Sequence, residues 1–449
     1  MDRLFGEVLK KTLLHMTHAE LGDREDLAPA EQDGAVTSDL RRTGEHAPIT
    51  WDLIRMVEHS PELKTLLQEA IREAAELNPD RRTNPVHSLE SYYAFLDRSA
   101  LALPWAIIPS EEYSDLYDRI DQSMGCFYFV CDQPLDALEG KGYYHNSLMY
   151  HEPFRSWLVK FTAEYGEFLN TEDSWCEEYY LRAKEDSRFQ LNGDLYESPE
   201  NWRTFNEFFA RRLRDPAERP IDAPEDDRVV VSPADAVAQS TWRIDENHRV
   251  IPEEPGQNRG IPIKTGTLTA VPALLGGSSY ARAFAGGRLT HTLLDVNDYH
   301  RYHFPVSGTV REVLIIPGDD APGGVITWDP EAGRYKEYGS EEIGWQSIET
   351  RGVVILEMDA GGLAAVVPVG MCEVASVNFE AAVKPGARMR KGDPLGYFLF
   401  GGSDVIMIFS REAGFAMTAE GGKHLNMGRE YGRLKTGSAG ISETETDDE

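Results

Sequence analysis

The apolar pattern of the chain changes near Pro220, and this change limits the folds it can adopt. Before that point the spacing is helical, as in the segment that opens at Ser60 with a serine cap, proline and glutamate and closes at Asn78-Pro79. After it come short Val- and Ile-rich runs separated by glycine and proline, such as RVVVSPADAV, SGTVREVLIIPGD and DVIMIF. Such runs are typical of a compact barrel or sandwich. We therefore expect an α+β fold, with a helical N-terminal domain followed by a β-rich, barrel- or sandwich-like domain.

The length of the chain supports a division into domains. With 449 residues it is too long for one small core, and two domains are the expectation. We place a helical domain of unassigned role at residues 1–200, the β-rich domain at 201–436, and a disordered acidic tail at 437–449, which ends in SETETDDE.

Charge and cysteine content exclude several classes of partner. The formal net charge of -31 argues against nucleic acid, whose phosphates require lysine and arginine, and against docking on an anionic membrane through bulk charge. The four cysteines form no CxxC pair and are few for a disulfide scaffold, which favours a reducing compartment. The longest apolar runs are short and contain prolines, so none can span a bilayer. We expect a soluble, cytoplasmic protein.

Three segments of the β-rich region carry residue types suited to nucleophilic catalysis. They are SPAD, which ends at Asp235, DYHRYHFP with His300 and His303, and a Gly-Gly-Ser turn that ends at Ser403. A serine hydroxyl is a weak nucleophile that needs a base, usually histidine, and the base needs a carboxylate to orient it. Wide separation in sequence is no obstacle, because triads assemble in space. On spacing alone the signal is weak, since any chain of this size contains these residue types.

A family resemblance strengthens the signal. From about Phe205 to Phe409 the chain resembles the phosphatidylserine decarboxylase family at five motifs in the family's order. They are FNEFFARRL with the following RPID, SPAD, DYHRYHFPVSG, VGMCEVASV and KGDPLGYFLFGGS. The helical N-terminal region and the FGGS form of the last motif resemble the soluble branch that decarboxylates tryptophan and other aromatic amino acids.

The resemblance implies a self-cleaving pyruvoyl enzyme. By this analogy His303, held by Asp235, deprotonates Ser403, and the serine oxygen attacks the carbonyl of Gly402. The chain then divides between Gly402 and Ser403, and the former serine becomes a pyruvoyl group at the start of a small chain, residues 403–449. That group acts as the electron sink that PLP provides elsewhere, so neither PLP nor a metal is expected. The family's first signature histidine, here His300, is assigned to the decarboxylation step.

Two substrates and one non-enzymatic alternative stay open. We favour a free L-amino acid, aromatic and tryptophan-like, because the chain has no membrane span and is strongly acidic. The first alternative is phosphatidylserine, converted to phosphatidylethanolamine. The second is a binding protein that never cleaves. The expected partners are the small amino-acid substrate or the lipid, the chain's own cleaved fragment, and a second copy in a homodimer.

The chain departs from the family pattern at a few positions. Ala236 follows SPAD where the family usually has glycine, Asp404 follows the cleavage serine, and Met371-Cys372 replaces small residues. These changes bear on maturation rate and substrate fit more than on reaction type. A second GGSS, from residue 276 to 279, lies where the family has an ordinary loop, and we take it as a decoy. The arginines at 211, 212 and 214 are expected on a solvated helix face.

Overall fold

The structure is a computed structural model that describes residues 46–108, 113–141, 144–253, 270–319, 324–339, 343–372 and 376–435. From His46 onward the chain forms one compact unit. Helices precede strands, so the predicted α+β class is confirmed. The boundary at residues 200/201 stays a prediction, and the acidic tail at 437–449 lies outside the described residues.

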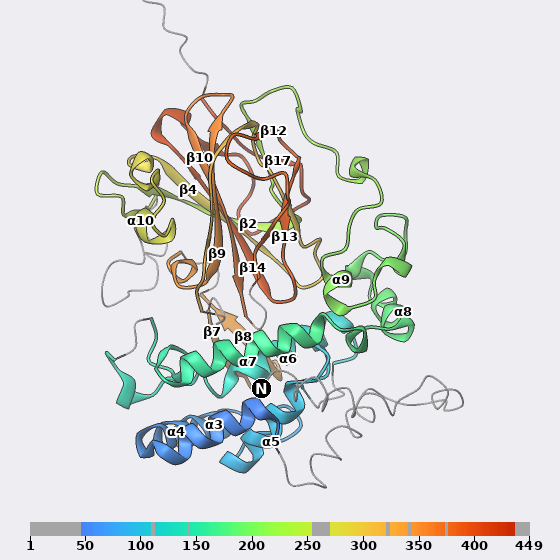
Figure 1. Cartoon of the computed structure of the whole chain (residues 1–449), viewed down its shortest axis with the longest axis vertical. Coiled ribbons are helices and arrows are strands. Elements are labelled where there is room, and N and C mark those ends of the chain that lie inside the picture. The colour runs from blue at the N-terminus through green and yellow to red at the C-terminus, as the bar shows by residue number, and fades with distance from the viewer. Residues whose placement is uncertain are drawn as a thin grey trace, which may run out of the picture. The chain divides into compact units, whose positions relative to one another are not determined.

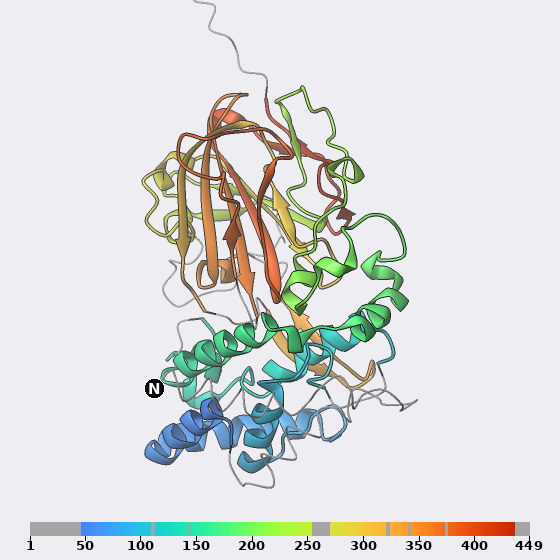
Figure 2. The ribbon, with the colours of Figure 1, turned by 45° about the vertical axis from the view of Figure 1, so that its right-hand side comes forward.

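The helical part begins with amphipathic helices that pack through one face. The N-terminus of α4 forms as its sequence predicts, because the hydroxyl of Ser60 accepts a hydrogen bond from the N–H of Leu63 and Pro61 occupies the first turn. Helices α6 and α7 lie between α3–α5 and the large sheet (Figures 1 and 2). The helices are α3 (Pro48–His59), α4 (Pro61–Leu77), α5 (Leu89–Ser99), α6 (Leu116–Phe129), α7 (Phe154–Leu169), α8 (Glu177–Glu185), α9 (Phe205–Phe209) and α10 (Val271–Leu274).

The strands form one large antiparallel sheet with smaller sheets beside it. The large sheet has the order β12-β6-β9-β10-β14-β4-β2-β16, with β3 paired to β2. Its strands are β2 (Ala236–Ile244), β3 (Val250–Pro252), β4 (Arg288–Leu294), β6 (Gly308–Ile316), β9 (Thr350–Met358), β10 (Leu363–Met371), β12 (Arg388–Met389), β14 (Gly402–Phe409) and β16 (His424–Leu425). The smaller sheets are β11 (Asn378–Phe379) with β13 (Pro394–Tyr397) and β5 (Arg301–His303), then β1 (Val229–Val231) with β17 (Glu430–Arg433) and β15 (Ala416–Met417), and the hairpin of β7 (Val325–Asp329) and β8 (Arg334–Tyr338).

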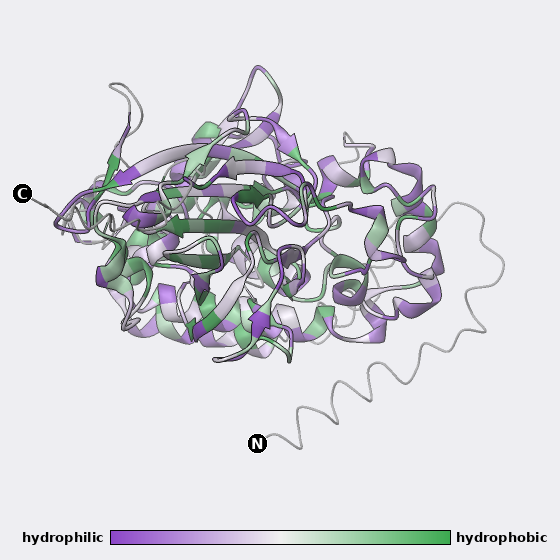
Figure 3. Cartoon of the chain, turned by 90° about the horizontal axis from the view of Figure 1, so that it is seen from above, coloured by the Kyte–Doolittle hydropathy of each residue, from purple (hydrophilic) through white to green (hydrophobic). Residues whose placement is uncertain are grey.

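Both faces of the central strands are buried. Alternate residues of β14 contribute to two separate apolar clusters, Val405 and Met407 to one, Ile406 and Ile408 to the other. The second cluster continues into the helical part of the chain. A strand that is covered on both faces has a continuous apolar sequence rather than one in which apolar and polar residues alternate. The middle strands are accordingly coloured green, for hydrophobic residues, in Figure 3.

The β7–β8 hairpin leaves the β-rich region and packs against helix α6. The backbone N–H of Tyr335 donates to the side-chain oxygen of Gln122 (2.6 Å), and the side-chain nitrogen of Gln122 donates back to the Tyr335 carbonyl (3.1 Å). The Tyr335 hydroxyl donates to the carbonyl of Thr83 (2.7 Å). A Cβ at Gly125 would lie 2.6 Å from the Tyr335 Cβ, so this glycine permits the close approach. The hairpin therefore ties the two parts of the chain together.

We predict that Tyr335→Ala lowers the free energy of unfolding by about 3–5 kcal/mol, because it removes a buried ring and the hydrogen bonds of its hydroxyl. Urea denaturation checks this value. Tyr338→Ala is the matched control, since Tyr338 lies on the same strand but is 56% exposed, and its effect should stay within about 0.5 kcal/mol. Equal effects of the two variants would show that the hairpin does not anchor the helices.

Candidate active site

Ser403 lies near the start of β14, between two neighbouring strands of the large sheet. It pairs with Gly370 of β10 on one side and Leu294 of β4 on the other. The residue is buried, and its Oγ has no hydrogen-bond partner among the described residues. A buried hydroxyl without a partner loses its hydration without compensation, which costs about 1–3 kcal/mol. An unpaired hydroxyl of this kind does not stabilise the fold, which makes it a candidate reactive group.

The bend before Ser403 needs its two glycines. Gly401 has a φ of +140°, which favours glycine. A Cβ at Gly402 would lie 2.6 Å from the Cγ of Met371, so a larger residue would displace that side chain. The N–H of Phe400 donates to the side-chain oxygen of Asn206 in α9 (2.9 Å). The bend is therefore positioned by β10 and by a helix.

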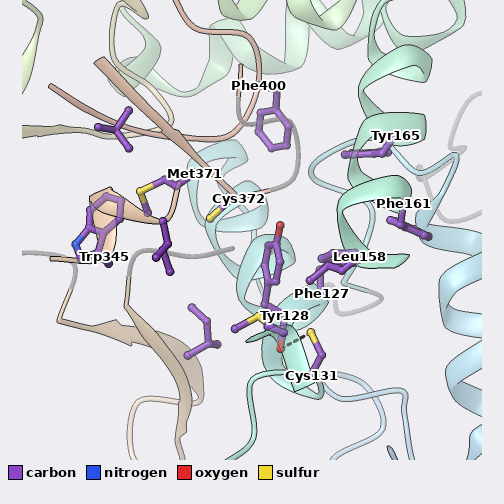
Figure 4. Close-up of a cluster of buried hydrophobic side chains, with 14 of the residues drawn as sticks. Phe127, Tyr128, Cys131, Leu158, Phe161, Tyr165, Trp345, Met371, Cys372 and Phe400 are labelled. Carbon is purple, nitrogen blue, oxygen red and sulfur yellow. Dashed lines mark hydrogen bonds between the residues drawn. The ribbon is translucent and has the colours of Figure 1, made fainter. Parts of the chain in front are cut away.

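The helical part of the chain reaches the same bend. The ring of Phe400 packs edge-on against Phe205 and Phe209 of α9, at centroid distances of 5.3 and 5.4 Å. Tyr128 of α6 points toward Cys372 and Phe400 (Figure 4). The substitution at Met371-Cys372 thus falls where the two parts of the chain meet, in one continuous apolar cluster.

His303 has the geometry of a neutral base. Its Nδ1 lies 2.9 Å from the carbonyl of Gly392, so this nitrogen carries the proton and donates. Nε2 is then the lone-pair nitrogen, and it accepts from the hydroxyl of Tyr299 (3.2 Å). Burial lowers the pKa of His303 to about 4. In the uncleaved chain no hydrogen bond among the described residues joins His303 to Ser403.

Asp235 is buried, but its carboxylate binds another residue. Both oxygens accept from the guanidinium of Arg219, at 2.5 to 3.1 Å, and Oδ1 also accepts from the N–H of Met427 (2.7 Å). Asp235 makes no hydrogen bond to His303 within the described chain; its negative charge acts on that histidine through space and opposes the lowering of its pKa. The RPID motif contained Arg219, yet nothing in the sequence linked that arginine to SPAD.

His300 is buried against an aromatic ring. It stacks on Phe209, with ring centroids 3.8 Å apart, and its Nδ1 donates to the carbonyl of Asp298 (2.9 Å). Its backbone carbonyl accepts from the N–H of Phe398 (2.9 Å), close to the bend in sequence. Burial, aided by the charge of Arg211, holds the pKa of His300 well below its ordinary value. The imidazole is therefore neutral and offers a lone pair at Nε2.

The arginine run after α9 differs from the predicted solvated face. Arg212 and Arg214 are exposed, but Arg211 is fully buried. The reason is that α9 ends at Phe209, so the following residues no longer share a helix face. The expectation was wrong for Arg211.

Asp404 points to the opposite side of the sheet from Ser403, because neighbouring strand residues alternate. Its carboxylate is buried and lies 3.0 Å from His291 Nδ1. It also accepts from the N–H of Thr292 (3.2 Å) and from the side chain of Gln346 (3.1 Å). The carboxylate next to the predicted scissile bond is therefore part of the structural network that holds β14 against β4.

The second Gly-Gly-Ser segment is an ordinary loop after α10. The hydroxyl of Ser278 binds the carboxylate of Glu312, and the hydroxyl of Ser279 binds the same group at 2.9 Å. Both serines thus have partners, in contrast to Ser403.

Within the described ranges no three His, Cys, Asp or Glu side chains come together to hold a metal ion. Of the helices that the structure describes, none combines the length and apolar content needed to cross a membrane.

Comparison with known proteins relates the region that contains this site to one protein family. The profile of the family described as "Phosphatidylserine decarboxylase" matches residues 205–433. The chain is 30% identical over 264 residues to the phosphatidylserine decarboxylase proenzyme of Brevibacillus brevis, a match that covers 54% of this chain and 83% of that protein. It is 26% identical over 286 residues to the decarboxylase iboD of Amanita muscaria, covering 58% of this chain and 78% of that protein.

A plant relative is much longer than the matched region. The chain is 34% identical over 225 residues to phosphatidylserine decarboxylase proenzyme 2 of Oryza sativa subsp. japonica, a match that covers 50% of this chain. It spans only 32% of the length of that protein.

We predict that Asp404→Ala lowers the free energy of unfolding by about 3 kcal/mol, because three buried donors lose their shared acceptor. Urea denaturation of Asp404→Ala, His291→Ala and the double variant measures the effect. The double variant should be less destabilised than the sum of the single ones. Strictly additive losses would show that the two side chains do not act as a pair.

Proposed function

The chain belongs to the phosphatidylserine decarboxylase family, and from this membership we propose that it is a self-processing, pyruvoyl-dependent decarboxylase. Members of this family are pyruvoyl-dependent carboxy-lyases that cleave themselves and take the cofactor from a serine. The observation that carries the proposal is Ser403, a buried and unpartnered hydroxyl directly after a bend of two glycines.

The residues at the bend fit the group that the family makes from serine. The Ser403 Oγ is not engaged in the folded structure, so it is available for reaction. Gly402 has no side chain beside its own carbonyl, and the backbone N–H of Phe400, two residues upstream, is fixed by Asn206. When formed, the pyruvoyl group would supply an electron sink next to the amine of a bound substrate.

Maturation follows from these residues. The lone pair on Nε2 of His303 takes the hydroxyl proton of Ser403, and Oγ attacks the carbonyl carbon of Gly402. The Gly402–Ser403 peptide bond breaks as an ester forms, and the released amino group gains a proton. Loss of the Ser403 Cα proton and cleavage of the Cβ–Oγ bond then free Gly402 as a carboxylate terminus. Water converts the remaining dehydroalanine to the pyruvoyl group and ammonia.

The neighbouring side chains suit the second reaction, decarboxylation. His300 is buried beneath the ring of Phe209, and its neutral Nε2 can take a proton from an incoming amine. Tyr299 donates to His303, and Asp235 holds Arg219, so both residues position the site rather than react.

The substrate must carry a primary amine next to a carboxylate, and two classes fulfil this. A free aromatic amino acid is supported by the apolar rings beside His300 and by the decarboxylase iboD, whose name refers to no phospholipid. Phosphatidylserine is supported by the names of the rice and Brevibacillus relatives. The tryptophan-like preference, the homodimer and the cytoplasmic location stay predictions.

Intact mass spectrometry of the denatured protein tests the proposal. We expect two chains, residues 1–402 and a small chain that begins at 403 with a pyruvoyl group in place of serine. Ser403→Ala should give one intact chain without activity, because the attacking oxygen is gone. Ser278→Ala, in the second Gly-Gly-Ser segment, is the matched control and should cleave normally. A wild-type chain that stays whole and unmodified would instead favour the uncleaved binding protein.

The pKa of His303 leads to a second test. Since burial lowers this pKa to about 4, the neutral base predominates at every pH above that value. The rate of self-cleavage should therefore stay level as the pH falls through the ordinary histidine range and drop only near pH 4. His303→Ala should abolish cleavage. Quench-flow samples resolved by electrophoresis give the rates, with circular dichroism to confirm that the protein is still folded at each pH.

A midpoint near the ordinary histidine pKa of about 6.5 would contradict this assignment. Efficient cleavage of the His303→Ala variant would remove the residue from the reaction altogether.

A further inference from the structure

The amide side chain of Asn206 connects the cleavage bend to the helical part of the chain. Its Oδ1 accepts from the backbone N–H of Phe400 (2.9 Å), two residues before Gly402, and its Nδ2 donates to the Oδ1 of Asn170 (2.9 Å). Asn206 and Phe400 are both buried. Asn170 directly follows the last residue of helix α7. The three side chains and backbone groups therefore form one continuous path from α7 to the bend.

The orientation of the Asn206 amide follows from its partners. A backbone N–H can only donate, so the atom that faces Phe400 must be the oxygen. The NH2 group is then left for Asn170, which accepts from it. An amide turned the other way would place two donors face to face and leave the buried N–H of Phe400 unpaired, which is costly. The bond to Asn170 therefore supports the one orientation that holds Phe400.

Helix α9, which carries Asn206, owes its position to residues before it in the chain. It has only five residues, and a helix this short is not stable by itself. The N–H of Phe205 donates to the hydroxyl of Ser174 (2.9 Å), and the ring of Phe208 stacks on Trp175 with centroids 4.2 Å apart. The segment that follows α7 therefore determines where α9 lies.

These supporting contacts come from outside the region that matches the family. The match begins at residue 205, and the contacts are made by Asn170, Ser174 and Trp175. Nothing in the sequence assigned a role to the helical part of the chain. Its contacts with α9 supply one.

The bend needs support because of its composition. Gly401 and Gly402 have access to more backbone conformations than other residues, so fixing them costs more conformational entropy. Downstream, β14 is fixed by its pairing with β10 from Gly402 onward. Upstream, the bond to Asn206 fixes Phe400. Only Gly401 lies between these two fixed points, so the carbonyl of Gly402 is held in one place relative to the Oγ of Ser403.

We propose that the helical part of the chain positions the cleavage bend through Asn170 and Asn206, an inference that rests on the self-processing proposed above. Asn206 is a positioning residue, because it acts on Ser403 through the backbone of Phe400. Attack within a chain is fast only when the two reacting atoms are held in near-attack geometry, and a displacement of about 1 Å can slow it on the order of 100-fold. Loss of the Asn206 bond should therefore slow self-cleavage while the attacking groups remain in place.

Self-cleavage of the newly synthesised full-length chain tests the proposal. Cell-free translation with a pulse of radioactive methionine, followed by electrophoresis, gives the rate. Asn206→Leu removes the acceptor and should cleave roughly tenfold more slowly than wild type, or slower still. Asn206→Asp keeps an oxygen toward Phe400, and the exposed amide of Asn170 can turn to donate to it, so its rate should stay within about threefold of wild type. Asn201→Leu changes an exposed asparagine just before α9 and should cleave like wild type.

The contribution of the helical part is tested at Asn170. Asn170→Ala removes the acceptor of the Asn206 NH2 group and leaves Asn206 itself in place, so cleavage should slow by roughly two- to fivefold. Thr171→Ala is the matched control, because the Thr171 hydroxyl donates to the carbonyl of Phe168 within α7 (2.7 Å). Asn170→Ala changes an exposed side chain, so it decides the proposal even if Asn206→Leu does not fold.

Hydrogen exchange in the full-length Ser403→Ala chain gives a readout that needs no cleavage. We expect the Phe400 amide to be protected in this parent. Asn206→Leu should speed its exchange by roughly tenfold or more, because the N–H loses its acceptor, whereas Asn206→Asp should keep the protection. Circular dichroism confirms that each variant is folded at the temperature of both assays.

Cleavage of Asn206→Leu or of Asn170→Ala at the wild-type rate overturns the proposal. So does equal slowing of cleavage in Asn206→Leu and Asn206→Asp, since the acceptor oxygen would then not matter, and so does Phe400 exchange that is the same in Asn206→Leu and its parent. If the wild-type chain stays whole while Phe400 exchange depends on Asn206, the proposed self-processing fails and the support of the bend stands.

Discussion

The structure depends on how the peptide bond before Ser403 is held at the start of a central strand. β14 pairs with β10 from Gly402 to Phe409 and with β4 from Ser403 to Phe409, and this register fixes Ser403 between Gly370 and Leu294. The two preceding residues must be glycine, one for its positive φ and one because Met371 occupies the space of a Cβ. The carbonyl of Gly402, where cleavage is proposed, therefore belongs to the first residue of the paired strand. The sheet supplies rigidity and the glycines supply access.

Burial then determines the protonation of the groups around this bond. His300 precedes β5 and His303 ends it, and both side chains are buried. Burial lowers the pKa of each histidine, so both are neutral and offer a lone pair at neutral pH. Successive side chains of β14 point to opposite faces of the sheet. Ser403 therefore points to the face where the reaction is proposed, and Asp404 points to the other face, where it binds His291. Arg211 is the exception, because its charge is buried without a counterion of its own.

Local patterns in the sequence were sufficient for the fold class and for the helix that follows Ser60, because caps and apolar spacing act over a few residues. Motif order gave the family, and with it the residue types of the site. Pairings between distant residues were not predictable. SPAD suggested a partner for His303, yet Asp235 binds Arg219, since that choice depends on how two loops meet. The burial of Arg211 was missed because its run of arginines was read as a helix, whereas α9 ends at Phe209. After that point the chain is extended enough for Leu213 to bridge to Tyr196, and neighbouring side chains alternate between inside and outside.

The topology also determines what happens to the two chains after the proposed cleavage. The fragment that begins at Ser403 contains β14 at the centre of the large sheet, β16 at its edge beside β2, and β17 between β1 and β15. β14 pairs with β10 and β4, β16 with β2 and β17 with β1, so four sets of backbone hydrogen bonds hold the fragment to residues before 403. On the other side of the cut, Phe400 stays fixed to Asn206 of α9. Breaking one peptide bond therefore releases only the local bend. The new terminus at residue 403 remains at the end of β14, where Ser403 is paired with Gly370 of β10 and Leu294 of β4.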